Sequence, residues 1–200
     1  MIQYIDKDKL RRSLKALNIL DVIAAPPEDD WLRIINSGVS EDNTAWYIID
    51  NGSGDELMVL FGEIGVFIKG FDHENDLNQF AADEWDAAFF EHMFSGLPKE
   101  MLDLLTEDER DNTTFCMWYL DESGEWNQNE ADGNDGGKNY LLGYIHQSAK
   151  SFYDWAVEYY DREFDYNIIQ KLFETGSLPP EEILILNPEC NPQRVLNEVI

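Results

Sequence analysis

The 200-residue chain has few cysteines and no long apolar run. Its two cysteines, Cys116 and Cys190, do not form a C-x-x-C pair, which excludes a disulfide framework and the zinc and redox motifs built on that spacing. No stretch approaches the roughly 18 apolar residues of a membrane helix, and the first residues lack the apolar run of a signal peptide. We therefore expect a protein that works in the cytoplasm, away from membranes.

Sequence motifs of catalysis are also missing. Ser53 lies between two glycines but lacks the G-x-S-x-G pattern, and the glycines of residues 52–65 are not followed by the Lys-Ser or Lys-Thr of a phosphate-binding loop. The three histidines, His73, His92 and His146, show no H-x-x-x-H or H-E-x-x-H spacing. We therefore assign no catalytic residue, cofactor or metal ion from the sequence, and favour a protein that is not an enzyme.

Basic side chains are scarce as well, with 14 Lys and Arg against 41 Asp and Glu, for a formal charge of −27. Such a charge repels nucleic acid and anionic membranes and favours a basic protein as the partner. A generically acidic protein without such a partner is the alternative that composition leaves open. The bases are unevenly placed, because five of the 14 lie in the first 15 residues: Lys7, Lys9, Arg11, Arg12 and Lys15.

Short apolar runs predict an antiparallel sheet. Residues 45–50, 56–61 and 66–71 are three such runs separated by tight polar or glycine turns, a pattern typical of a three-stranded meander. In the third run Lys69 alternates with apolar neighbours, so we expect one face to be partly solvated. Residues 113–120 predict a strand buried on both faces, which would bury Cys116, and a short strand near Trp126 completes a second strand pair.

The remaining segments predict helices. Asp6 is a candidate N-cap for a helix over 7–17, and an apolar stripe predicts a helix over 76–94 packed on the meander. A short helix follows over 99–105. The C-terminal part is predicted to be helical, over 151–164, from Asp165 to Gly176, and after the prolines at 179, 180 and 192. The fold class is α+β, in a single domain over 1–200 with a weak boundary near 127–139.

Two groups of polar residues are candidate binding sites. The first is an acidic stretch without a base, which we predict to contact the partner: Asp121, Glu122, Glu125, Glu130, Asp132 and Asp135. The loop over 130–135 and the turn over 50–55 are rich in side-chain oxygens that could bind calcium. Neither has the residue spacing of an EF-hand, and ordinary Asx turns explain both patterns. The second is a possible polar site of Asp72, His73 and Glu74, between a predicted strand and a helix.

A family resemblance adds to these patterns. The stretch over 46–85 is similar to the back half of a SUKH-superfamily domain, in its Gly54-Asp55 turn between strands and in a strand ending at Phe71-Asp72-His73-Glu74 before a helix after Asn75. It covers about a fifth of the chain. The Leu-Pro segment expected before the sheet is not evident, and the last 100 residues have no counterpart. Many SUKH proteins are acidic bacterial immunity proteins that bind and block toxins.

We therefore expect an acidic protein-binding domain, with toxin neutralisation as the leading example. A carboxylate-rich surface would occupy the basic surface of a toxin and speed the association. Two alternatives remain: a DNA mimic that inhibits a nucleic-acid-binding protein, and a metal-assisted enzyme using Asp72, His73 and Glu74. The sequence indicates neither the identity of the partner nor the oligomeric state.

Overall fold

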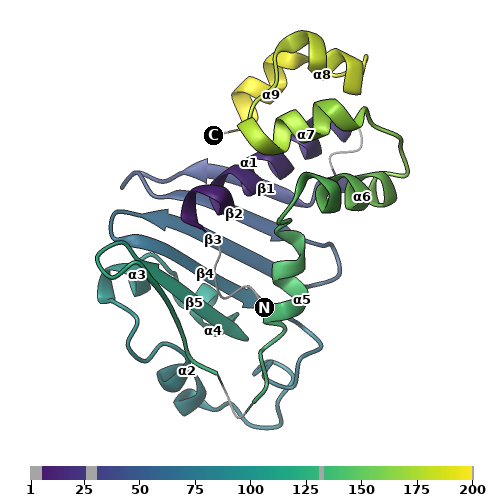
Figure 1. The fold of residues 1–200 in the computed structure, drawn as a ribbon. Coiled ribbons are helices and arrows are strands. Elements are labelled where there is room, and N and C mark those ends of the chain that lie inside the picture. Colours follow the sequence, from purple (N-terminus) through teal and green to yellow (C-terminus); the bar gives the residue numbers. More distant parts are fainter. Residues whose placement is uncertain (1–5, 26–30, 131–132, 200) are drawn as a thin grey trace. The chain divides into compact units, whose positions relative to one another are not determined.

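A computed structural model describes residues 6–25, 31–130 and 133–199 (Figure 1). The described residues divide into two compact units: a sheet unit of residues 39–144, and a helical unit formed by residues from 6 to 38 together with those from 145 onward. The loop over 127–139, where composition suggested a boundary, lies inside the sheet unit. Among the described residues, no helix has the length and apolar character needed to cross a membrane.

The sheet is antiparallel and its strand order follows the chain, as the meander pattern predicted (Figure 1). One row of paired residues runs from Tyr47 through Val59, Ile68 and Met117 to Gln128, and so fixes the register of five neighbouring strands. The strands are β1 (Ile35–Val39), β2 (Ala45–Asp50), β3 (Glu56–Gly62), β4 (Gly65–Phe71), β5 (Phe115–Leu120) and β6 (Glu125–Gln128). The α+β fold class is confirmed.

Short helices of the sheet unit pack on one face of this sheet. They are α2 (Ala87–Met93), α3 (Lys99–Leu102) and α4 (Glu107–Asp111), and α5 (Lys138–Leu141) follows β6. Met93, Leu97 and Met101 join strand residues such as Phe67 and Trp118 in one apolar cluster. This cover buries the face of β4 that contains Phe67 and Lys69, and the other face is buried as well, so the partly solvated face predicted for this strand is wrong.

Lys69 lies in that covered face with 0% of its surface exposed. Its Nζ donates to the carbonyl oxygen of Asn112 at 2.6 Å and lies 3.2 Å from Glu56 Oε1. Burial lowers the pKa of Lys69, because it penalises the charged form, and Glu56 opposes that shift. A buried lysine is tolerated only with such partners.

The helix predicted over 76–94 is wrong for most of its length, since turns continue to residue 86 and α2 begins at Ala87. Asn75, Asn78 and Asp86 each accept a hydrogen bond from the backbone N–H two residues later, at 3.1, 3.0 and 2.9 Å. The turns at Asn75 and Asn78 offer the backbone an alternative to the helix, whereas Asp86 is the N-cap that starts α2. The helix predicted over 99–105 is present as α3 but ends at Leu102. A capping box of Thr106 and Glu109 then starts α4, which was not predicted.

The helical unit contains α1 (Lys7–Ala24), α6 (Ala149–Tyr159), α7 (Tyr166–Thr175), α8 (Pro180–Leu186) and α9 (Pro192–Glu198). Asp6 caps α1 as predicted, although α1 extends to Ala24 because its apolar face continues past Leu17. The predicted cap and stop of α7 are confirmed, with Asp165 at its start and Gly176 at φ 66° at its end.

A buried carboxylate organises the helical unit. Asp21 accepts hydrogen bonds from the Tyr160 hydroxyl at 2.5 Å and from the backbone N–H groups of Ile34 and Ile35, and lies 3.3 Å from Arg33. Burial raises the pKa of Asp21, and these hydrogen bonds partly offset the shift. Because its partners lie on α6 and on the segment before β1, Asp21 joins three parts of the chain.

Cys116 is 1% exposed, and burial raises the pKa of its thiol to about 12. We expect a thiol reagent to modify Cys116 in the native protein at least about 100-fold more slowly than in the denatured chain, because reaction requires both access and the thiolate. Mass spectrometry of each cysteine over time measures this, with the less buried Cys190 as the internal comparison. Equal native and denatured rates at Cys116 would contradict the buried position of β5.

Candidate functional site

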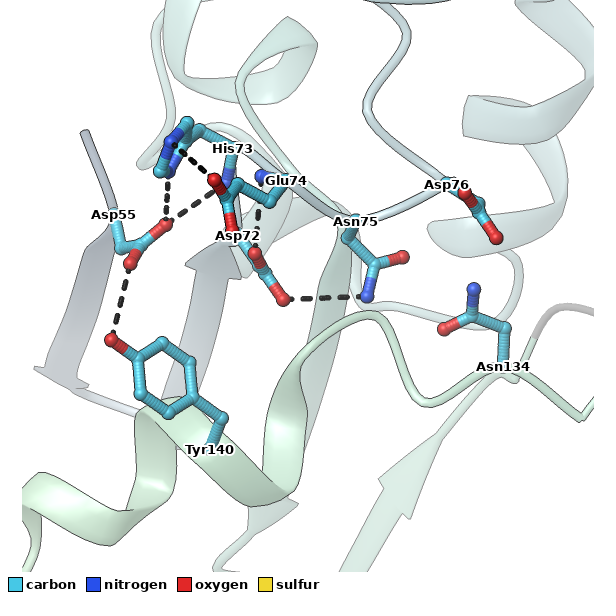
Figure 2. A pocket seen from close by; sticks show the side chains of 8 residues that line it. All are labelled: Asp55, Asp72, His73, Glu74, Asn75, Asp76, Asn134 and Tyr140. Carbon is cyan, nitrogen blue, oxygen red and sulfur yellow. Dashed lines mark hydrogen bonds and ion pairs between the residues drawn. The ribbon is translucent and has the colours of Figure 1, made fainter. Parts of the chain in front are cut away.

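Strand pairing brings the candidate site together at one end of β3 and β4. Glu56 pairs with Phe71 in the antiparallel register, so the next residues outward, Asp55 and Asp72, lie at the same edge of the sheet. His73 follows directly, and Figure 2 shows its ring turned toward Asp55. The β2–β3 turn is held in place by Asp50 and Asn51, whose side chains accept from backbone N–H groups two residues later, both at 2.8 Å.

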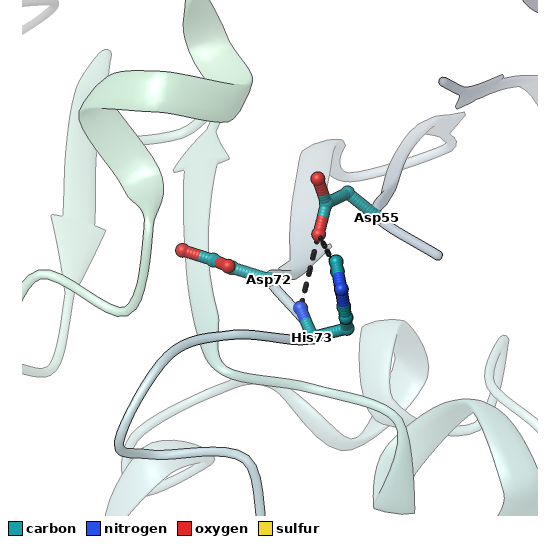
Figure 3. Close-up of side chains that lie close together, drawn as sticks. All are labelled: Asp55, Asp72 and His73. Atoms are coloured by element: carbon teal, nitrogen blue, oxygen red, sulfur yellow. Dashed lines mark hydrogen bonds and ion pairs between the residues drawn. The ribbon is translucent and has the colours of Figure 1, made fainter. Parts of the chain in front are cut away.

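The carboxylate of Asp55 is buried and takes four hydrogen bonds. Its Oδ1 accepts from the His73 ring Nδ1–H at 2.7 Å and from the His73 backbone N–H at 3.0 Å (Figure 3). Its Oδ2 accepts from Asn51 Nδ2 at 2.7 Å and from the Tyr140 hydroxyl at 3.3 Å. Because a carboxylate offers about four acceptor positions, Asp55 is saturated and serves to orient its neighbours.

The Asp55–His73 pair favours opposite charges on its two members. Burial by itself would raise the pKa of Asp55, but the hydrogen bonds from His73 and Asn51 outweigh it and leave that pKa below its ordinary value. The hydrogen bond that His73 donates to Asp55, with nearby carboxylates, raises the pKa of His73 above 6.5. The stabilisation linked to His73 is therefore complete below pH 6.5 and is lost as pH rises through its folded pKa. The contribution from Asp55 is lost when pH falls through its own lowered pKa.

The pair opens on a cleft of about 370 Å³ in the sheet unit (Figure 2). Four carboxylates, one imidazole, two amides and one phenol line it, and no Lys or Arg does so among the residues that the structure describes: Asp55, Asp72, His73, Glu74, Asn75, Asp76, Asn134 and Tyr140. A hydrogen bond with Tyr144, together with burial, raises the pKa of Tyr140 to about 12, so its hydroxyl remains a donor at neutral pH. The lining is rich in acceptors and suits an ammonium or guanidinium group.

Close approach of the backbone fixes Asp72 at the edge of this cleft. A Cβ atom at Gly137 would lie 2.4 Å from Asp72 Oδ2, so only glycine lets the segment before α5 pass here. Asp72 Oδ1 accepts from the Glu74 backbone N–H at 3.2 Å. Asp72 therefore both shapes the turn after β4 and presents its second oxygen toward the cleft.

A shared cation is geometrically conceivable at this edge, because Asp55, Asp72 and His73 each offer a ligand atom and these atoms lie within 4.8 Å of one another. A cation there would have to replace hydrogen bonds that already saturate Asp55. None of the described lining residues is Ser, Thr, Cys or Lys, so the cleft brings no such nucleophile beside the oriented imidazole. The arrangement is therefore best suited to binding a cationic side chain.

No protein-family model, curated protein or solved structure matches this chain. The geometry of the cleft and the distribution of charge therefore carry the functional argument.

The structure brings the predicted polar site together and enlarges it. Asp72, His73 and Glu74 all line the cleft, while Asp55 and Tyr140 were missed. Asp55 had been interpreted as part of a turn, yet the register of the two predicted strands would have placed it opposite Asp72. Tyr140 carried no such signal, because its place beside Asp55 depends on the path of the chain after β6.

The predicted acidic stretch divides into two groups at opposite ends of β6. Asp121, Glu122 and Glu125 are exposed at the turn between β5 and β6. Glu130 lies beyond the other end of the strand and is 2.9 Å from Lys138 Nζ. A four-residue strand spans roughly 13 Å, so the two groups are not one continuous patch.

The remaining residues of that stretch differ in role. Asp135 accepts from the backbone N–H groups of Gly137 and Asn139, both at 3.1 Å, and thereby shapes the start of α5. Asn134 accepts from the N–H of Gly136 at 2.9 Å in the same way. These are the Asx turns expected for the oxygen-rich loop. Asp132 lies outside the described residues.

We expect Asp55→Asn to lower the pKa of His73, because the substitution removes the charge that stabilises the imidazolium. NMR titration of the histidine rings measures this, with His146 of the helical unit as the internal control that should not change. We also expect the free energy of unfolding at pH 6 to fall by about 1–3 kcal/mol, the usual loss for a buried charge-assisted hydrogen bond. An unchanged His73 titration would contradict the pairing.

Proposed function

We propose that this chain is an acidic protein-binding domain whose partner is a basic protein. One observation carries the proposal: the excess of negative charge is concentrated in the sheet unit. Residues 39–144 contain 25 Asp and Glu against four Lys and Arg, a formal charge of −21. The remainder of the chain contains 16 Asp and Glu against ten Lys and Arg, a formal charge of −6.

The few bases of the sheet unit are already engaged inside it. Each is held by a neighbour: Lys69 by Glu56 and the Asn112 carbonyl, Lys99 by Asp103, Arg110 by the Leu102 carbonyl, and Lys138 by Glu130. About 20 acidic side chains of the unit therefore have no base of their own unit to neutralise them. Like charges at this density repel one another, and a basic surface placed against them relieves the repulsion.

The candidate cleft fits the same partner. The three carboxylates other than the saturated Asp55 can accept charge-assisted hydrogen bonds from the ammonium of a lysine or the planar fork of an arginine. The saturation of Asp55 keeps the lining in place before binding, which reduces the entropy lost on association. Asp72, Glu74 and Asp76 are the carboxylates that remain to contact the bound cation.

Toxin neutralisation is the specific form of this function that we favour. The similarity of residues 46–85 to SUKH immunity proteins supports it, as does a charge suited to a basic enzyme such as a nuclease. The DNA-mimic alternative requires a long, regular array of negative charges. Many acids of the sheet unit instead lie in turns and helix starts, with Asp42, Asp50, Asp72 and Asp86 each accepting from backbone N–H groups.

Salt and charge neutralisation test the proposal. The full chain is used to capture a partner from its source cells, and the association rate of the purified pair is then measured at two ionic strengths. We expect a basic partner whose association slows at least several-fold between 50 and 300 mM salt, because exposed charges are screened over roughly 8 Å at physiological ionic strength. The dissociation rate should change less.

A matched pair of triple variants localises the effect. The first variant removes three charges from the sheet unit and should slow association about two- to five-fold; its substitutions are Asp121→Asn, Glu122→Gln and Glu125→Gln. The second variant removes three exposed charges from the helical unit and should change the association rate less; its substitutions are Glu158→Gln, Glu181→Gln and Glu189→Gln. An association rate indifferent to salt and to the first triple variant would exclude the acidic surface as the binding surface.

A further inference from the structure

Aromatic rings form a continuous row in the segment between the end of β4 and the end of α2. Neighbouring ring centroids are 6.2 Å apart for Phe71 and Phe80, 5.6 Å for Phe80 and Trp85, 5.1 Å for Trp85 and Phe90, and 5.0 Å for Phe90 and Phe89. We call these five residues the aromatic ridge. All of its contacts have the edge-to-face or stacked geometry that aromatic pairs prefer.

The ridge is anchored at one end and exposed in its middle. Phe89 packs against the apolar cluster on the sheet, which includes Met93 and Trp118. Phe80 is 63% exposed and Trp85 is 47% exposed. Large aromatic rings exposed next to one another are unusual on a folded surface and mark sites of interaction.

Side-chain hydrogen bonds hold the exposed part of the ridge in one conformation. Asn78 accepts from the backbone N–H of Phe80, and Gln79 Oε1 accepts from the backbone N–H of Asp86, both at 3.0 Å. The same Asx turns that prevent a helix here therefore set the positions of Phe80 and Trp85. A rigid aromatic surface loses little entropy on binding.

The charge around the ridge indicates what would cover it. Residues 71–98 contain seven Asp and Glu and no Lys or Arg. Six of those acids are exposed: Glu74, Asp76, Asp83, Glu84, Asp86 and Glu91. Glu74 and Asp76 also line the cleft beside the Asp55–His73 pair, so the two features belong to one acidic segment.

We propose that the aromatic ridge is the docking surface for a basic segment of the partner protein, which places arginine or lysine side chains over the rings of Phe80 and Trp85. This inference rests on the proposed function. The cation is attracted by the ring faces and by the carboxylates around them, while its aliphatic stem covers apolar ring surface. A second copy of this chain is a poor occupant, because it would bring a charge of −27 against −27.

A defined peptide tests the surface without knowledge of the partner. The probe is the acetylated, amidated hexapeptide Arg-Leu-Arg-Arg-Leu-Arg, and the comparison peptide has Glu in place of each Arg. The readout is the set of indole N–H resonances of the six tryptophans, with that of Trp85 assigned through Trp85→Phe. We expect the basic peptide to shift the Trp85 resonance saturably, and the acidic peptide to leave it unchanged.

Two variants distinguish the ridge from diffuse charge attraction. Phe80→Ala should weaken binding of the basic peptide at least about five-fold, because it removes one of the two exposed rings. Trp31→Ala removes a ring that is 77% exposed in the helical unit, and should leave the affinity unchanged. The remaining indole resonances report whether each variant is folded.

The possible failures are separable. Two results would overturn the ridge as the docking surface and leave the proposed function standing. In the first, the basic peptide shifts other resonances in a salt-dependent way but not that of Trp85. In the second, it binds Phe80→Ala as tightly as the wild type. A basic peptide that shifts no resonance, or shifts no more than the acidic peptide, overturns both.

Discussion

The candidate site depends on one buried carboxylate. Asp55 joins the β2–β3 turn, the chain leaving β4 and the helix α5, because its donors Asn51, His73 and Tyr140 come from those three segments. A buried carboxylate with unfilled acceptor positions would be costly, so the arrangement tolerates little change in any donor. The result is a cleft whose walls are in place before a ligand arrives, with an imidazole biased toward its charged form.

The second constraint is the repulsion that the sheet unit must withstand. Its apolar core has to outweigh a charge of −21, and each of its four bases is paired with a specific acid or carbonyl group of the same unit. The helical unit is close to balanced, with Arg33 and Arg194 both paired to Glu198. A protein that required only solubility would not need such a separation of charge between its two units, and binding gives it a physical reason.

Sequence patterns predicted those parts of the fold that depend on interactions between residues close together in the chain. The strand runs other than β1, the tight turns, and the caps at Asp6 and Asp165 were found from the sequence, because each depends on residues close together in the chain. The helix over 76–94 failed in its first part because its apolar stripe has helical spacing while Asn75 and Asn78 bond to their own backbone, and Asp86 caps a later start at Ala87. The part of the stripe with Phe80 and Trp85 proved to be exposed, which periodicity cannot distinguish from a buried face.

Non-local partners limited the prediction of the site. Asp72, His73 and Glu74 were found because they follow one another, whereas Asp55 required the register of β3 against β4, and Tyr140 required the path of the chain after β6. The burial of Lys69 likewise depends on helices that come later in the sequence. These relations are set by packing, so a single sequence contains them only implicitly.

The discontinuity of the helical unit has a consequence for synthesis. Helix α1 ends at Ala24, but α7, against which it packs, begins at Tyr166. At translation rates of roughly 5–20 residues per second, the apolar face of α1 leaves the ribosome about 7 to 28 s before that partner exists. The sheet unit is continuous in the chain and is made entirely within this interval, so it can reach its native pairing while Leu10 and Leu14 still lack their final neighbours. The apolar face of α1 is therefore exposed to aggregation in the nascent chain until residues 145–200 have been synthesised.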